Sequence, residues 1–379
     1  MPSGFARRAP MLAILLAATT FVGGCASDGS SASAGSSSSS ASDAPDNRPA
    51  HRRLGFRLEW KSTPVTARRA KIADVAVYDD VLAVRDSVNT MSVLEISTGV
   101  NRWAGEVARP LDVVHGIART DGGEIAVSTD IELHLYDAKT GTLTQRQEFD
   151  FLTSTAPVII GRYVVLGGEN GQLLIHNMDS GYRQHAYDFG GRFDVPPIAI
   201  GHFVGAVSRN GNVYVIDPHR GSSIARTRVY AGVSATPDAS EDALFVASLD
   251  QSLWAFETDS GDTRWRLRTE GKLTSSPVHH DGVVYCVIPK RGLSAIDAYS
   301  GDVIWENADV QAPPVVKRGD RLIVWDGAMA HAVQAVSGDI MDSVAMPGVS
   351  SMHTNKFNEG DLYTVSVRDT EIRRHRPIN

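Results

Sequence analysis

Few residues of this chain combine the types and the spacing that catalysis or metal binding needs. Asp238 to Asp242 contains spaced acids but lacks the central Gly and terminal Glu of a calcium-binding loop, so we interpret it as a solvated turn. His279 and His280 stand directly before Asp281, and we interpret them as part of an exposed turn rather than as metal ligands. The sequence contains no Gly-x-Ser-x-Gly, His-Glu-x-x-His or Gly-rich phosphate-binding motif. We therefore predict no catalytic residue, no metal site and no cofactor.

One residue does indicate a covalent modification, and it is Cys25. Arg7 and Arg8 precede an apolar stretch from Met11 to Val22, and Val22-Gly23-Gly24-Cys25 follows. The apolar stretch is too short to span a bilayer, so residues 1–25 have the pattern of an export signal. Small residues before a cysteine are typical of a bacterial lipobox, in which the cysteine is acylated and becomes the mature N-terminus. We therefore predict lipidation of Cys25, with an ordinary cleaved signal peptide as the alternative.

The segment that follows the predicted lipid site, residues 26–54, is dominated by Ser and Ala at its start and has few large apolar residues. Such a composition buries too little surface to offset chain entropy, so we expect a disordered tether with a reach of roughly 30 Å. Ala26 follows the lipid cysteine where Asp would favour retention in the inner membrane. We therefore predict export, and a lipid anchor in the outer membrane facing the periplasm.

The charge of the chain excludes some classes of binding partner, and its cysteines indicate how the fold is stabilised. The chain has a formal net charge of −7 and no basic cluster, which argues against nucleic acid and against electrostatic docking on anionic lipid. The membrane contact that we predict is therefore the N-terminal lipid alone. The second cysteine, Cys286, lies in a run of Val, Tyr and Ile suited to a buried strand, so we interpret it as a small core residue.

The remaining sequence is one repeated unit, and its clearest mark is a glycine turn. The turns recur at intervals of about 40 residues, the period of β-propeller blades built from four short strands. They end at Gly99, Gly141, Gly181, Gly221, Gly261, Gly301 and Gly338. The acid or amide that starts most of these turns, such as Asp297, can bond nearby backbone N–H groups, so we assign these acids to turn chemistry and not to a metal.

Aromatic residues recur with the same period. Trp103, Trp265 and Trp305 each stand four positions after a turn glycine, and we expect their rings to wedge against the adjacent blade. The C-terminal residues supply first, second and third strands with no fourth, whereas residues 57–61 supply a strand with Trp60 before the first unit. We therefore predict an all-β, eight-bladed propeller over residues 55–379, whose N-terminal strand completes the last blade and closes the ring.

The repeat resembles the pyrroloquinoline-quinone-type propeller repeat. The resemblance is clearest in one unit, which contains Ser276-Pro277-Val278, Val283-Val284-Tyr285, Gly292 to Asp297, Ser300-Gly301 and Trp305. That repeat implies the fold, but it occurs both in quinone-dependent dehydrogenases and in proteins that bind no quinone. A quinoprotein dehydrogenase or a small-ligand-binding propeller is therefore the alternative function. The chain lacks the adjacent cysteine pair that many of those enzymes carry.

A lipobox, a polar tether and a single propeller together look most like the BamB family, the lipoprotein subunits of the outer-membrane β-barrel assembly machinery. That resemblance implies a non-catalytic scaffold that binds a protein partner in the cell envelope, a BamA-like barrel assembly subunit, through loops at one end of the propeller. We expect a monomer. Because loops on a rigid scaffold usually carry recognition, we predict partner-binding residues on the face opposite the glycine turns: Glu169, Asn170, Arg192, Arg209, Asn210, Asp250, Lys290, Arg291, Asp326, Arg368 and Asp369.

Overall fold

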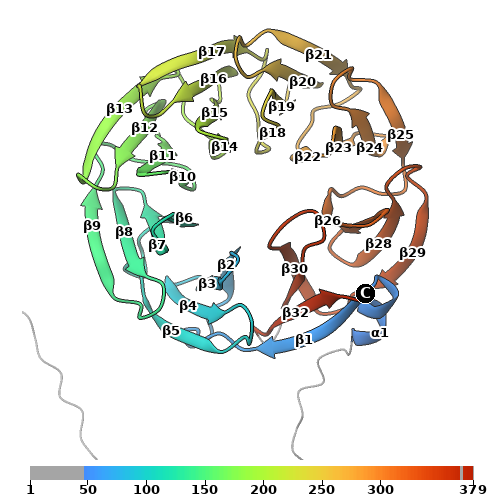
Figure 1. Ribbon diagram of the computed structural model, residues 1–379, viewed down its shortest axis with the longest axis horizontal. Coiled ribbons are helices and arrows are strands. Elements are labelled where there is room, and N and C mark those ends of the chain that lie inside the picture. Colours follow the sequence, from blue (N-terminus) through green and yellow to red (C-terminus); the bar gives the residue numbers. More distant parts are fainter. Residues whose placement is uncertain (1–46, 368–369, 379) are drawn as a thin grey trace, which may run out of the picture. The chain divides into compact units, whose positions relative to one another are not determined.

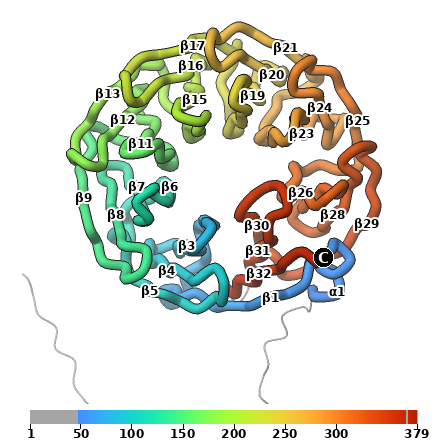
Figure 2. Tube along the Cα trace, viewed as in Figure 1, coloured from blue at the N-terminus to red at the C-terminus, as the bar shows by residue number. Residues whose placement is uncertain are grey.

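The computed structural model describes residues 47–367 and 370–378. These residues form eight antiparallel sheets of four strands each, arranged as blades around a common axis (Figures 1 and 2). Within each of the first seven blades the strands follow one another in sequence, with the first nearest the axis and the fourth at the rim. The predicted eight-bladed propeller is confirmed. No helix among these residues has the length and apolar character needed to cross a membrane.

The blades are numbered along the chain, and each sheet contributes one blade. Blade 1 consists of β2 (Ile72–Val77), β3 (Val81–Asp86), β4 (Thr90–Glu95) and β5 (Asn101–Glu106). Blade 2 consists of β6 (Val114–Arg119), β7 (Glu124–Thr129), β8 (Glu132–Asp137) and β9 (Leu143–Glu148). Blade 3 consists of β10 (Val158–Ile160), β11 (Tyr163–Gly167), β12 (Gln172–Asn177) and β13 (Tyr182–Asp188). Blade 4 consists of β14 (Ile198–Ile200), β15 (Phe203–Val207), β16 (Asn212–Asp217) and β17 (Ser222–Arg228). Blade 5 consists of β18 (Asp238–Ala239), β19 (Ala243–Ser248), β20 (Ser252–Glu257) and β21 (Thr263–Arg268). Blade 6 consists of β22 (Val278–His280), β23 (Val283–Ile288), β24 (Gly292–Asp297) and β25 (Val303–Asn307). Blade 7 consists of β26 (Pro314–Arg318), β27 (Arg321–Trp325), β28 (Met329–Gln334) and β29 (Ile340–Ala345). Blade 8 consists of β30 (Val349–Thr354), β31 (Leu362–Ser366), β32 (Ile372–Pro377) and β1 (Phe56–Ser62).

Blade 8 joins the two ends of the described chain. Its strand order is β1-β32-β31-β30, so the N-terminal strand is its outermost member. The two terminal strands pair antiparallel, with Leu58 opposite His375 and Trp60 opposite Arg374. This pairing confirms the predicted closure, and it explains why a Trp stands before the first repeat.

The core lies between blades. The second and third strands are buried on both faces, as in Val81 to Val84 of β3, because each sheet is covered by a neighbour on either side. One cluster combines Phe245 of blade 5 with Val284 and Cys286 of blade 6. Cys286 is completely buried, and burial raises the pKa of its thiol to about 12, so its assignment to the core is confirmed.

In blades 1, 5 and 6, a tryptophan of the outer strand binds the blade to the next one. Trp103 donates its indole N–H to the carbonyl of Ala138 at 3.1 Å, and Trp265 donates to Ala298 at 2.9 Å. Trp305 makes the same bond to the carbonyl of Ala335 at 2.9 Å. The expected wedge is confirmed, and the carbonyl that accepts each bond precedes the glycine turn of the following blade.

A short helix, α1 (Arg48–Arg53), lies within the range that the sequence analysis assigned to the tether. The helix contacts β1 and β29, and the Arg53 guanidinium donates to Asp342 at 2.9 Å. The buried rings of His51 and His375 stack at 3.6 Å and 7°. The tether boundary at residue 54 is therefore too late, because polar residues gain order here through cross-blade contacts. Residues 26–46 and Cys25 lie outside the described residues.

Another expectation from the sequence is wrong, and one is right only for part of its range, since Glu241 and Asp242 do lie exposed between β18 and β19 but Asp238 does not. His279 and His280 belong to β22, the innermost strand of blade 6, and neither lies in an exposed turn. Asp238 belongs to β18, where its carboxylate accepts the backbone N–H of His279 at 2.6 Å. Burial raises the pKa of Asp238, so it is a bridge between the inner strands of blades 5 and 6 and not a residue of a solvated turn.

Candidate protein-interaction surface

One face of the ring carries all the predicted partner-binding residues that are described. The connections between second and third strands emerge there, and so do the connections between blades; we call this the loop face. In blade 3, Gln172 at the start of β12 pairs with Asp188 at the end of β13, which places both kinds of connection at the same end of the sheet. The glycine turns and the connections between first and second strands form the opposite, turn face. Arg368 and Asp369 lie outside the described residues.

Three of the predicted residues meet in an ion-pair network between blades 3 and 4. Arg192, in the connection between these blades, lies 3.0 Å from the Glu169 carboxylate and 2.8 Å from Asp194. Arg209 of blade 4 reaches the second oxygen of Asp194 at 2.8 Å. Hydrogen bonding by Asp194 raises the pKa of Arg192. The loops of two blades thus present one alternating row of charges.

The predicted amides support these loops from within. Asn210 donates its side-chain amide to the carbonyl of Gly190 at 2.6 Å, which ties the blade 4 turn to the connection that carries Arg192. Asn170 accepts the backbone N–H of Gln172 at 3.0 Å and stays within its own turn. The amides are therefore positioned to hold the loop conformation beside the charge network.

A second group forms around Asp250 in blade 5. The carboxylate accepts the indole N–H of Trp254 at 3.0 Å and the backbone N–H of Tyr230 at 2.9 Å. The Arg266 guanidinium carbon lies 4.2 Å from the Trp254 ring centroid and 5.0 Å from that of Tyr230. Tyr230 is 73% exposed although its neighbours hold it in place. An exposed, preorganised aromatic ring beside Arg and Trp has the composition of an interface hot spot.

Of this group, only Asp250 was predicted from the sequence, whereas Tyr230, Trp254 and Arg266 were not. The available signal was in the third strand, where Trp254 occupies a position that holds Ser92 in blade 1 and Ser294 in blade 6. Blade 4 carries Tyr214 at the same position, with the Arg226 guanidinium carbon 5.2 Å from its ring centroid, so an aromatic ring beside an arginine recurs in these two neighbouring blades.

The other predicted residues do not join either group. Lys290 pairs with Glu270 at 2.8 Å, and Arg291 pairs with Glu306 at 3.0 Å, both at exposed sites of blade 6. Asp326 accepts the backbone N–H groups of Ala328 and Met329 within its own turn in blade 7. These residues are engaged locally, and exposed pairs of this kind contribute little to stability.

Exposed apolar residues occupy the same face around blades 1 to 3, and the charged loop residues predicted from the sequence do not include them. Leu152 is linked directly to the charge network, since its carbonyl accepts the backbone N–H of Glu169 at 2.9 Å. The group consists of Val65, Leu111, Val113, Ile131 and Leu152, which are between 41% and 96% exposed. The loop face therefore offers an apolar arc next to a charged one.

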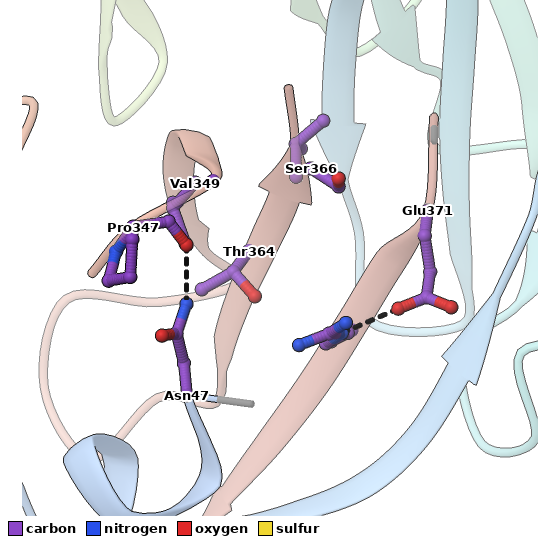
Figure 3. A pocket seen from close by; sticks show the side chains of 9 residues that line it. Asn47, Pro347, Val349, Thr364, Ser366 and Glu371 are labelled. Carbon is purple, nitrogen blue, oxygen red and sulfur yellow. Dashed lines mark hydrogen bonds and ion pairs between the residues drawn. The ribbon is translucent and has the colours of Figure 1, made fainter. Parts of the chain in front are cut away.

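A small cavity lies where the chain enters the described ring, beside blade 8 (Figure 3). The Asn47 amide donates to the carbonyl of Pro347 at 3.0 Å at its edge, and Thr364, Glu371 and Arg373 line it. Its volume is about 20 Å³, enough for one water molecule. Among the described residues, no group of three or more His, Cys, Asp or Glu side chains is placed to hold a metal ion.

Known proteins resemble this chain both in sequence and in fold. The curated outer membrane protein assembly factor BamB of Burkholderia pseudomallei is 27% identical over 116 residues, a match that spans 31% of this chain and 30% of that protein. The crystal structure of BamB from Moraxella catarrhalis superposes with a TM-score of 0.66 at 20% identity, covering 84% of this chain and 98% of the other. The C-terminal WD40 domain of Sif2 superposes with a TM-score of 0.64 at 11% identity, covering 85% and 98%, so the fold alone is shared with it.

The family model described as outer membrane protein assembly factor BamB matches residues 57–188 and 209–346. These two segments together make up more than half of the chain and include strands of all eight blades, since β1 belongs to blade 8. The chain therefore belongs to the family of outer membrane protein assembly factor BamB.

Proposed function

We propose that this protein is a non-catalytic scaffold that binds a protein partner through its loop face during outer-membrane protein assembly. The partner class that the family suggests is a BamA-like barrel assembly subunit. The observation that carries the proposal is Tyr230, whose exposed ring lies beside the Arg266 guanidinium and whose backbone N–H is bound by Asp250. Such a group loses little conformational entropy on binding.

The adjoining surfaces support the same reading. The row Glu169, Arg192, Asp194 and Arg209 supplies charges of both signs for register and specificity. The apolar arc of blades 1 to 3 supplies area to remove from water. A face that combines an aromatic anchor, ordered charges and exposed apolar side chains suits a protein partner better than a small ligand.

The membrane anchor is part of the proposal. We infer that Cys25 carries a lipid and that the chain enters the ring from the loop side, because Asn47 bonds to Pro347 in the connection between blades 7 and 8. Replacement of Cys25 by Ala is expected to move the protein from the membrane pellet to the soluble fraction. Labelled palmitate that fails to appear on the wild-type protein would contradict the inference.

The partner surface is tested by affinity purification from detergent-solubilised envelope. Tyr230→Asp is expected to lower recovery of the barrel assembly subunit at least about tenfold, which corresponds to ~1.4 kcal/mol. Tyr182→Asp is the matched control, because Tyr182 is 76% exposed but lies at the turn face. Equal recovery with both variants would refute the assigned face. Absence of any stable partner, together with a thermal shift on adding quinone and calcium, would favour the ligand-binding alternative.

A further inference from the structure

The turn face contains an arrangement that differs between blades. In blade 1, Arg102 occupies the β-bulge of the outer strand, between the paired residues Asn101 and Trp103. Its guanidinium lies 2.6 Å from Glu95 and 3.5 Å from Asp80, so an ion cluster fills the space that faces blade 2. Arg119 of blade 2 also forms an ion pair with Asp80, at 2.8 Å, so the cluster joins the two blades.

Blade 5 repeats this cluster in the same positions. Arg264 occupies the bulge of β21, and its guanidinium lies 2.6 Å from Glu257 and 2.8 Å from Asp242. The hydrogen bond from Arg264 lowers the pKa of Glu257. The side chain of Arg264 is only 9% exposed. In both blades an arginine therefore closes the space at the boundary with the next blade.

Blade 6 has lost that cluster. Ile304 occupies the bulge of β25, and Gly282 stands where blades 1 and 5 have Asp80 and Asp242. A cleft of about 280 Å³ opens at the boundary with blade 7. Its lining is mostly apolar and consists of His280, Asp281, Val283, Tyr285, Ile304, Lys317, Ala335 and Val336.

The mouth of the cleft is apolar as well. Ile304 and Val336 line the cleft and are 50% and 74% exposed, so the apolar wall continues to the surface. Exposed apolar residues that converge on one cleft indicate a binding site more strongly than the same residues scattered singly.

The chain's own N-terminal segment is a poor occupant. Asn47, where the description of the chain begins, bonds to Pro347 at the loop face, on the other side of the ring. Residues 26–46 contain only Ala, Ser, Asp, Gly and Pro, and none of these side chains would fill an apolar cleft of this size. The occupant must therefore bring a large apolar side chain from another molecule.

Charge defines the rest of the occupant. Asp281 lines the cleft, and Asp302 and Asp339 stand on the turns that carry Ile304 and Val336. Lys317 also lines the cleft, and the neighbouring Arg318 is paired with Glu359 at 3.2 Å. Basic residues on either side of the apolar side chain would therefore be favoured.

We propose that the cleft between blades 6 and 7 binds a partner segment that inserts one large apolar side chain and carries basic residues beside it. The site lies on the turn face, opposite the proposed partner surface, so it goes beyond the proposed function. A scaffold with both sites holds two segments at once, one on each face of the ring.

The test is fluorescence anisotropy with the full-length protein in detergent and a labelled peptide that has a central Trp-Val pair between lysine and serine flanks. Ile304→Arg rebuilds the arginine of blades 1 and 5 beside Asp297, and it is expected to fold normally and weaken binding at least about tenfold. Gln184→Arg is the matched control, because Gln184 occupies the same bulge in blade 3 and is exposed. Its binding is expected to equal that of the wild-type protein.

A second variant and several further results test the proposed cleft. Val336→Glu is a second variant at an exposed position, and loss of binding there as well supports the cleft. The proposal is overturned if no saturable binding occurs, if Ile304→Arg and Gln184→Arg bind equally, or if a peptide with glutamate flanks binds better than the lysine one. It is likewise overturned if sedimentation shows a dimer that Ile304→Arg abolishes, because a second copy would then be the occupant. Tyr230→Asp is expected to leave peptide binding unchanged, so a failure of the proposed partner surface stays distinguishable.

Discussion

At the scale of single residues, four of the blade boundaries have a tryptophan ring placed over a turn glycine. Gly301 has a φ of 78°, and a Cβ added there would lie 2.7 Å from the Trp265 ring. Gly99 is related in the same way to Trp60, at 2.6 Å. These glycines therefore meet two demands, a left-handed backbone and the close approach of a ring. Gly181 meets only the first, because its added Cβ would lie 3.7 Å from Gln147.

This difference gives a prediction with an internal control. Gly301→Ala and Gly181→Ala impose nearly the same backbone strain, since φ is 78° and 74°, but only Gly301→Ala collides with a ring. We expect Gly301→Ala to lower the free energy of unfolding by at least about 1 to 3 kcal/mol more than Gly181→Ala. Urea unfolding measures both. In a Trp265→Ala background the excess should vanish, and its persistence would show that the ring is not its cause.

At the scale of elements, β1 completes one blade and stabilises its boundary with the next. It completes blade 8 by pairing with β32, and Trp60 donates to the carbonyl of Ile96 in blade 1 at 3.0 Å. Arg374 of β32 donates to the same carbonyl at 2.6 Å. The preceding helix α1 adds contacts to blade 7 through Arg53 and Asp342. The last blade is thus held by residues from both ends of the chain.

Deletion of residues 55–61 should consequently destabilise the whole ring and not blade 8 alone. Without β1 the edge of β32 is unpaired, and the boundary with blade 1 loses a buried tryptophan. We expect a melting temperature lower by more than about 10 °C in a thermal scan, or failure to fold. A chain that starts at Asn47 is the control and should melt like the parent. If the deletion variant also melts like the parent, the closure does not stabilise the ring.

At the scale of the whole molecule, several buried imidazoles are neutral and link stability to pH. Burial lowers the pKa of His51 to about 4, and burial lowers that of His176 to about 4. His375, stacked on His51, has its pKa lowered further still by burial, with smaller contributions from His51 and Arg373. Below the ordinary histidine pKa of about 6.5, these imidazoles bind protons in the unfolded chain but stay neutral in the folded ring.

The free energy of unfolding is therefore expected to be constant above pH 6.5 to 7 and to fall as the pH drops from about 6.5 to about 4. Each of these histidines contributes up to about 2 to 3 kcal/mol to that fall. Denaturant titrations across this range measure it. His51→Phe keeps a ring on His375 but removes one titrating group, so its profile should be flatter. A profile that matches the wild type would exclude His51 as a source.

Sequence patterns predicted the parts of the fold that rest on local chemistry. Gly99 to Gly338 and the tryptophans marked the period, and Trp60 indicated that the first strand closes the last blade. The same reasoning missed α1 and misplaced Asp238 and His279. Their order comes from contacts across blades, such as the bond from His279 to Asp238, and no local pattern encodes such a contact. The candidate surface divides in the same way, because Asp250 was found as a loop residue whereas its partner Arg266 was not.

By itself the sequence determined the number of blades, the position of the turns and the order in which the strands close the ring. Each of these depends on backbone conformation and side-chain type within one repeat, where a positive φ or a buried strand leaves a direct mark. Only the tertiary structure decided which side chains meet. Glu169, Arg192 and Arg209 come together, and Ile304 and Val336 face one cleft, because the ring places residues from successive blades side by side. Those distances arise from the packing of whole sheets, which no single repeat contains.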